Sequence, residues 1–476
     1  MEIENKEIQE TIQQENKEED FLYLLDGFTL TQSYLIKGCQ RPHKLYLHHY
    51  CLENIPQISK PTEINVLDIF NSNLLQSETN EIKENEDQKE EDEILSPFKT
   101  RGIILLKLNS ICRGNSPVQK ETILLLQKLY EEDILPIIPT MTKRSPCGNT
   151  YHISAVGKVL MGEGEVLYNN ERKATKEVFE QLNITPIQFQ DPEYKIFIEG
   201  NEMNTVSIVD GYDKITKYLQ ALAVGVSLAI VSKGKMGKSL ETHFFRQFTT
   251  KGMSRLTNLI KNFFTRTKEE EEKKEENKNK EETPIEIKPI ETDPIVIDVV
   301  CSFGRIFEII LFIHELLPME LNGTRDQYYV VQKKEEIGIS EPSWGIGSFS
   351  GVIAREIIGI AKDLQCLCKR YSSLVSNQEN ENEMKKEDEN ISLQMNVNQS
   401  PYEIALNQMK YRLHEVCEMI SQFYIQLKQV SFGETFENEF IPQLIEKIKS
   451  IEDDKFIHAI KFGELKSIIK SLHFDF

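Results

Sequence analysis

Residues 104–166 read ILLKLNSICRGNSPVQKETILLLQKLYEEDILPIIPTMTKRSPCGNTYHISAVGKVLMGEGEV. In and beside this stretch, two segments (102–112 and 119–131) repeat apolar side chains at three- and four-residue spacing, and that period predicts two helices. A long irregular connection, 134–148, follows them. Long connections in compact domains are usually functional or disordered, and the aliphatic residues around the first prolines of this one favour function.

The helical period continues outside this stretch. It predicts long helices over 213–231, 303–317, 351–370 and 402–429, several of them apolar nearly all round. Such helices must be buried in a bundle or an oligomer. Strand-like alternation is scarce, and the one short β-branched run is Ile295–Val300. We therefore expect an all-α fold, an elongated bundle of long central helices, in a single domain over 21–476.

The negative charge is concentrated in four polar windows. The chain has 56 lysines and arginines against 76 acids, a net charge of −20. Windows 1–20, 78–93, 268–282 and 377–389 carry −6, −7, −3 and −4, which account for that total. They contain few apolar residues, so we expect a disordered acidic tail and three disordered acidic inserts. So acidic a chain is not expected to bind nucleic acid or an anionic membrane surface.

The sequence predicts neither a membrane segment nor a metal site. The longest uncharged stretch, Tyr218–Ser232, has 15 residues, against the roughly 20 that a membrane span needs. The eight cysteines show no paired-ligand spacing. The first residues are acidic and polar, without the apolar segment of a secretion signal. We expect a cytoplasmic protein with reduced cysteines.

Three groups of residues in the opening stretch carry a resemblance to a known family. They are Asn109 with Arg113-Gly114 and Ser116, then Ile138-Pro139, then Gly162-Glu-Gly-Glu165. In that order they resemble the aromatic amino-acid ammonia-lyase family, the histidine and phenylalanine ammonia-lyases. Weaker matches follow the same order along the chain: Leu25–Leu30, Asn73–Ser77, Thr292–Pro294 and Glu320–Asp326. The resemblance implies the elongated helical fold of the L-aspartase/fumarase type, in which four chains assemble and each active site draws on three of them.

The same register places Pro146-Cys147-Gly148 on the family's Ala-Ser-Gly tripeptide. In the family this tripeptide closes into the methylidene-imidazolone electrophile, MIO, without an external cofactor. The backbone nitrogen of the glycine attacks the carbonyl two residues earlier, and the central residue then loses its β-substituent. A thiol is a competent leaving group, whereas the fixed φ of Pro146 limits how the turn can compress. The tripeptide is therefore the candidate catalytic element, and a buried free cysteine after a turn proline is the alternative.

Most other residues of the family's site have no match. The glycine-rich loop that carries the family's tyrosine base corresponds to Ile64–Phe70 (INVLDIF), which contains neither Tyr nor Gly. The arginine that binds the substrate carboxylate corresponds to Asp298, and the tyrosine three residues before it to Ile295. An Arg-to-Asp exchange turns attraction into repulsion, each about 1 to 4 kcal/mol at 4 Å. Only Asn204 matches the family's substrate-binding asparagine.

Two alternatives remain beside a divergent lyase that is impaired or inactive in deamination. One is an active ammonia-lyase or aminomutase with a rebuilt pocket. The other is a nucleotide-binding protein that uses Ser232–Ser239 (SKGKMGKS), which differs from a P-loop at one residue, Ser232 in place of the first glycine, with Leu228–Val231 and Ile295–Asp298 as strands. The chain lacks the alternation of strands and helices that such a site requires. As partners we expect an amino-acid ligand and further copies of the chain, as a homotetramer.

Overall fold

The computed structural model describes residues 23–47, 65–74, 94–140, 150–232, 250–262, 294–323, 329–333, 336–340, 349–375, 401–430 and 440–462. The four acidic windows lie outside these residues. The chain divides into two compact units, 1–210 with 315–351 and 400–406, and 211–314 with 352–399 and 407–476. The single domain expected over 21–476 stays a prediction.

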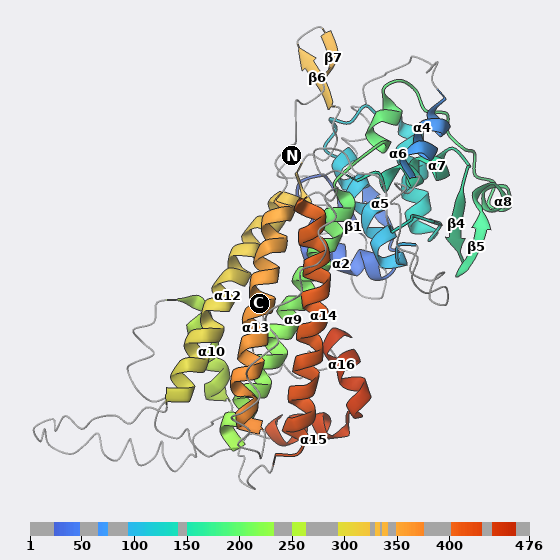
Figure 1. Cartoon of the computed structure of the whole chain (residues 1–476). Helices are drawn as coiled ribbons and strands as arrows, with labels where there is room; N and C mark the ends of the chain where they lie inside the picture. The colour runs from blue at the N-terminus through green and yellow to red at the C-terminus, as the bar shows by residue number, and fades with distance from the viewer. Residues whose placement is uncertain are drawn as a thin grey trace, which may run out of the picture. The chain divides into compact units, whose positions relative to one another are not determined.

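The first unit is built around buried helix α5 (Pro97–Ile111). Pro97 stands at its first position, where the missing N–H is no loss. The aliphatic run Ile103–Leu106 is at most 1% exposed, so the helix is covered on all sides. Helices α2 (Gln32–Gln40) and α6 (Lys120–Glu131) pack against it. The unit also contains α4 (Val66–Leu74), α7 (Ile153–Leu160), α8 (Thr175–Gln181) and the 3₁₀ turn η1 (Glu193–Phe197) (Figure 1).

Small sheets accompany these helices. One has the order β3-β4-β5 and is antiparallel, with strands Leu135–Pro136, Glu165–Tyr168 and Glu171–Ala174. A parallel pair joins β1 (Tyr23–Leu25) to β2 (Leu45–Leu47), and an antiparallel hairpin joins β6 (Tyr329–Lys333) to β7 (Glu336–Ser340). These strands are short, and helices make up most of the described elements. The prediction of an all-α fold is therefore confirmed.

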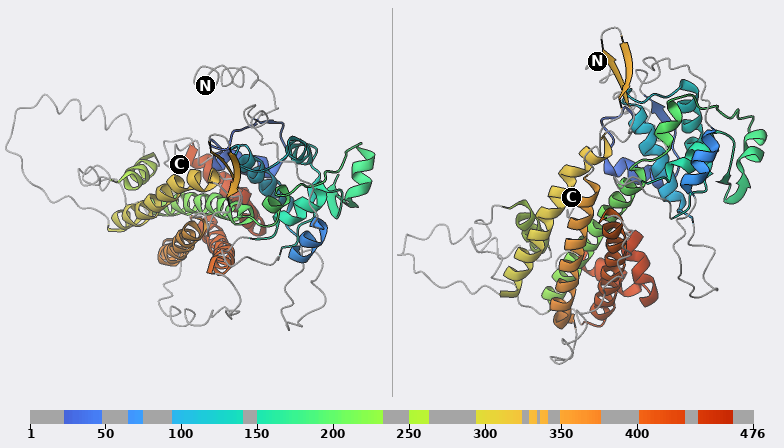
Figure 2. Two further views of the ribbon diagram at one scale, coloured as in Figure 1. Left: turned by 90° about the horizontal axis from the view of Figure 1, so that it is seen from above. Right: turned by 45° about the horizontal axis from the view of Figure 1, so that its top comes forward.

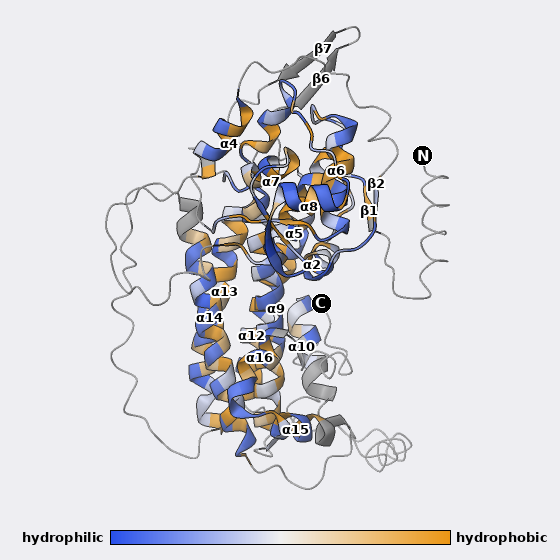
Figure 3. Ribbon diagram, turned by 90° about the vertical axis from the view of Figure 1, so that its right-hand side faces the viewer, coloured by the Kyte–Doolittle hydropathy of each residue, from blue (hydrophilic) through white to orange (hydrophobic). Residues whose placement is uncertain are grey.

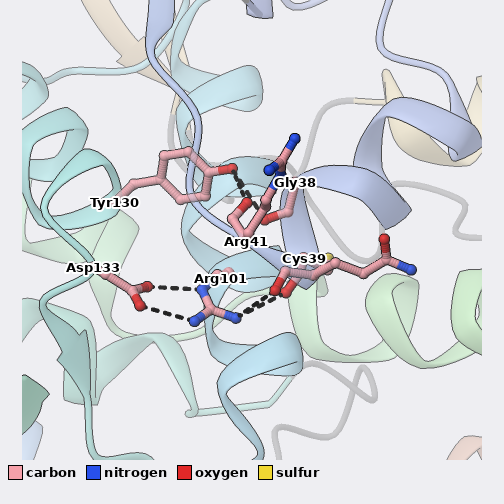
Figure 4. A network of polar contacts seen from close by, with 7 residues as sticks. Gly38, Cys39, Arg41, Arg101, Tyr130 and Asp133 are labelled. Atoms are coloured by element: carbon pink, nitrogen blue, oxygen red, sulfur yellow. Dashed lines mark hydrogen bonds and ion pairs between the residues drawn. The ribbon is translucent and has the colours of Figure 1, made fainter. Parts of the chain in front are cut away.

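The carboxyl end of α2 is closed by side chains from two other helices. Arg101 forms a two-pronged contact with Asp133, at 2.7 and 2.9 Å, and donates to the carbonyl oxygen of Cys39 at 3.2 Å. The hydroxyl of Tyr130 donates to the carbonyl of Gly38 at 3.0 Å (Figure 4). These donors satisfy carbonyls that the end of a helix leaves without partners.

Long helices dominate the second unit. They lie side by side in Figures 1 and 2 and are α9 (Glu202–Ser232), α12 (Pro294–Leu321), α13 (Ser350–Val375) and α14 (Pro401–Lys428), accompanied by α10 (Lys251–Asn262), α15 (Phe440–Ser450) and α16 (Phe456–Phe462). Each helix predicted from the apolar period is present. Gly225 of α9 lies against Phe423 and Tyr424 of α14, where a Cβ would stand 3.1 to 3.3 Å from their rings.

One interpretation of the sequence needs correction. The β-branched run Ile295–Val300 is helical, in α12. Its residues Val296, Val299 and Val300 are 0% exposed and lie three and four apart, so burial of one helix face overrides their strand preference.

The helices that look apolar nearly all round are covered largely within this chain, as members of a bundle. On 303–317, only Phe312 is a large exposed apolar side chain, and Figure 3 shows hydrophilic residues interspersed along the long helices.

Candidate functional site

Residues that match the family meet in one hydrogen-bonded network of the first unit. The side-chain oxygen of Asn109 accepts from the backbone of Gly27 at 3.0 Å, and its nitrogen donates to Asn322 at 3.1 Å. Asn322 in turn pairs with both the N–H and the carbonyl of Leu30, at 3.0 and 2.9 Å. Arg113 donates to the carbonyls of Gly27 and Asn322. These residues thus hold three distant chain segments together.

Gly27 is required by the backbone at this place. Its φ of +82° lies in the left-handed region, and a Cβ there would stand 2.4 Å from the side chain of Arg113. Asp26 closes the same turn by accepting from the backbone of Phe28 and Thr29, each at 2.8 Å. The residues that match the family at Leu25–Leu30 therefore fix the backbone of this turn.

The segment that carries the candidate electrophile is anchored at both ends. Pro146, Cys147 and Gly148 themselves lie outside the described residues. Before them, the carbonyl of Ile138 accepts from Leu95 at 2.7 Å. After them, Thr150 and Gly200 exchange two backbone hydrogen bonds of 2.9 Å. Gly200 stands four residues before Asn204 in the chain. These two hydrogen bonds therefore join Thr150, which follows the candidate tripeptide, to the segment that leads to Asn204.

Asn204 is 2% exposed, in the first turn of α9. Its amide nitrogen donates to the side-chain oxygen of Asn201 at 2.7 Å. Asn201 donates to Glu320 at 2.9 Å, and Thr205 donates to the same oxygen of Glu320 at 2.8 Å. One of the two amide hydrogens of Asn204 is thus donated within the start of its own helix.

Glu320 belongs to the match at Glu320–Asp326, but the sequence motifs indicate neither its buried contacts nor the buried ion pair beside Asn204 in the chain. Glu320 is 4% exposed and its second oxygen accepts from the backbone of Phe349 at 2.8 Å, at the start of α13. Nearby in the chain, Lys107 and Glu202 are paired at 3.4 Å with side chains 0% and 2% exposed. Lys107 also lies 5.6 Å from the ring centre of Phe197. The one signal of this ion pair in the sequence is a lysine, Lys107, within an otherwise aliphatic stretch of α5.

The stretch that corresponds to the family's tyrosine loop is a helix. Described from Asn65 on, it enters α4 at Val66. Phe70 is 0% exposed, its ring lies 5.7 Å from that of Phe189 in an edge contact, and it lies so close to Gly157 of α7 that no Cβ would fit there. A core position therefore occupies this place, and no described side chain of this stretch offers a phenol.

Asp298 does not stand as a lone negative charge. Both of its oxygens accept from Nη1 of Arg370, at 3.1 Å each, and one accepts from the hydroxyl of Tyr371 at 2.7 Å. Burial alone would raise the pKa of Asp298, but the hydrogen bonds from Tyr371 and Arg370 outweigh it and hold the pKa below its usual value. Burial and the contact with Asp298 raise the pKa of Tyr371, so it stays a neutral donor. The repulsion expected from the sequence is thus offset by Arg370.

The strands of the nucleotide-binding alternative are absent from the described residues. Leu228–Ser232 is the last part of α9, and Ile295–Asp298 lies in α12. Residues 233–239 lie outside the described part of the chain. A P-loop needs a strand that delivers its glycine-rich turn to the phosphates, and a helix occupies that place here.

Within the described residues, no group of three or more His, Cys, Asp or Glu side chains is arranged to hold a metal ion. No helix in the same ranges combines the length and apolar character that crossing a membrane demands.

Comparisons with known proteins agree with the resemblance. The family model "Aromatic amino acid lyase" matches residues 59–252. A histidine ammonia-lyase of Staphylococcus aureus (strain JH9) is 33% identical over 110 residues, which is 23% of this chain and 22% of the enzyme. The matched segment thus spans about a fifth of the length of the curated relatives.

Solved structures share the fold over nearly the whole chain. Histidine ammonia-lyase from Trypanosoma cruzi superposes with a TM-score of 0.70 at 14% identity, covering 95% of each chain. Tyrosine aminomutase from Streptomyces globisporus gives 0.68 at 14% identity, covering 94% of this chain and 98% of the other. At such identity the superposition shows the fold alone. In sequence, residues 59–252 are thus homologous to the aromatic amino acid lyases, the histidine ammonia-lyases among them, and in structure the chain shares an all-α fold with solved members.

Proposed function

We propose that the chain is a divergent homologue of the histidine and aromatic amino-acid ammonia-lyases that is impaired or inactive in deamination. The observation that carries the proposal is Phe70. Where the resemblance calls for a glycine-rich loop with a tyrosine base, the chain has helix α4, and Phe70 is sealed in the core against Gly157 and Phe189. Proton abstraction needs a titratable group within hydrogen-bond reach of the substrate, and a buried phenylalanine cannot supply one.

Asn204 supports the same proposal. An amide that binds substrate needs its donor and acceptor available to the ligand. In this chain one of its two amide hydrogens is donated to Asn201 at 2.7 Å, and Asn201 is itself held by Glu320. The residue that matches the family's substrate-binding asparagine is therefore tied to the first turn of α9.

The tripeptide Pro146-Cys147-Gly148 fits the electrophile only in part. Its anchors are present at Ile138 and at the Thr150–Gly200 pair. Against it stand the proline in place of alanine and the engaged amide of Asn204. The groups that the family reaction needs around the ring are thus incomplete among the described residues.

The test is release of product from histidine, phenylalanine and tyrosine by the purified chain, followed by the ultraviolet absorbance of urocanate, cinnamate or coumarate. We expect no release above that of the Cys147→Ala variant, which serves as the matched control. Turnover within a hundredfold of an ordinary lyase, at about 1 to 10³ per second, and abolished in Cys147→Ala, would favour the active enzyme with a rebuilt pocket instead.

A further inference from the structure

We propose that a basic surface formed by Lys37, Arg41 and Lys44 binds the acidic N-terminal segment, residues 1–20, of the same chain. The three side chains are exposed, and they belong to α2, to its C-cap and to the residue before β2. Residues 27–52, which contain all three, include no acidic residue, although the whole chain has a net charge of −20. This surface of the first unit is therefore opposite in sign to the chain as a whole.

The three positive charges lie close together. Residues four apart lie on the same side of a helix, and the backbone N–H of Arg41 donates to the carbonyl of Lys37 at 3.4 Å. Lys44 follows Arg41 by three residues, so their Cα atoms are at most about 11 Å apart. The Debye length at physiological ionic strength is about 8 Å. A segment that covers this surface therefore feels all three charges together.

The acidic residues next to this surface are engaged with other groups. Glu131 accepts from a backbone N–H of β2 at 2.7 Å, and Asp133 is paired with Arg101 at 2.7 Å. Among the described residues, neither Arg41 nor Lys44 forms an ion pair. The surface keeps a net positive charge even when the charge of Glu131 is counted, so it attracts an anionic segment.

The N-terminal segment fits this surface by its charge and by its point of attachment. Eight acids and two lysines give residues 1–20 a charge of −6. The segment leads into β1, and β1 pairs with β2 so that Tyr23 stands opposite Leu45, the residue after Lys44. Twenty residues extend to about 66 Å, which is ample to reach Lys37. A short tether gives an effective concentration of the order of mM, so surface ion pairs that are weak singly suffice together.

The fluorescence anisotropy of a dye on the N-terminal amine of the full chain reports this contact. We expect a high anisotropy at about 0.01 M salt, where the Debye length is about 30 Å, and a low one at about 1 M, where it is about 3 Å. The triple variant Lys37→Glu, Arg41→Glu, Lys44→Glu should give the low value at both salt concentrations, because the segment and the surface then repel each other. The matched control reverses three exposed lysines of other elements and should behave like the unchanged chain: Lys447, Lys449 and Lys455.

An exchange of charges across the contact distinguishes it from an effect on folding. Adding Glu15→Lys, Glu18→Lys and Glu19→Lys to the triple glutamate variant places opposite charges on the two sides again. This sixfold variant should therefore recover the high anisotropy at low salt. Far-ultraviolet circular dichroism of each variant checks that its helices are those of the unchanged chain.

Three results would overturn the inference: an anisotropy that salt does not change, a triple variant that matches the unchanged chain, or a charge exchange that fails to restore the contact. A high anisotropy that disappears on dilution would assign the segment to the surface of a second copy, and it would overturn docking within one chain.

Discussion

Replacing Lys107 by methionine should destabilise the protein severely. The side chains of Lys107 and Glu202 are 0% and 2% exposed and 3.4 Å apart, so each charge depends on the other for compensation. Removing one partner of a buried pair leaves an uncompensated charge and costs about 3 to 5 kcal/mol. This is a large part of the 5 to 15 kcal/mol that usually separates folded from unfolded states. Removing the other partner of the pair, by Glu202→Leu, should cost a similar free energy of unfolding.

The double variant distinguishes this reasoning from simple loss of contacts. Lys107→Met with Glu202→Leu removes both charges together, and replacing a buried pair by apolar residues is often neutral or stabilising. We therefore expect the double variant to be more stable than either single variant, by urea unfolding followed by far-ultraviolet circular dichroism. Lys455→Met, which breaks the exposed pair with Glu452, is the control and should leave the midpoint unchanged. Losses that simply add in the double variant would refute the argument.

Three further outcomes are expected. Arg101→Ala should lower the free energy of unfolding by about 1.5 to 3 kcal/mol, since charge-assisted hydrogen bonds to Asp133 and to the end of α2 are lost; an unchanged urea midpoint would contradict this. The depressed pKa of Asp298 contributes stability above the unfolded pKa near 4 that disappears as the pH falls through the lower folded pKa. Asp298→Asn should therefore show a slightly shallower loss of melting temperature between pH 6 and 3, and an identical profile would refute the assignment. Light scattering at micromolar concentration should give a homotetramer of about four times 55.2 kDa, and a 55.2 kDa monomer would contradict that.

The helices could be predicted because their signal is local. In α5, α9, α12, α13 and α14 the apolar period alone marks buried faces, and every one of them is present. Ile295–Val300 shows the limit, because β-branched residues signal a strand until the three-residue spacing of Val296 and Val299 is read as a buried helix face.

The site could be predicted less well, because the role of each site residue depends on partners that are far away in the chain. Asn204 was found by its motif, yet its role follows from Asn201 and from Glu320, 116 residues later. The charge of Asp298 suggested repulsion, whereas its partner Arg370 is 72 residues away and has no motif around it. Exposed charges of this kind become informative only when packing shows which of them meet.

The intact mass of the purified chain tests most directly whether this chain has the family's fold but does not form the family's electrophilic ring. The measurement requires no guess about the substrate, because the ring on which the family's reaction depends is formed by the chain itself. We expect the mass of the unmodified sequence, with Cys147 as a free thiol that a thiol reagent can label after unfolding. A chain lighter by one water and one hydrogen sulfide, restored to the full mass of its own sequence by Cys147→Ala, would contradict the account.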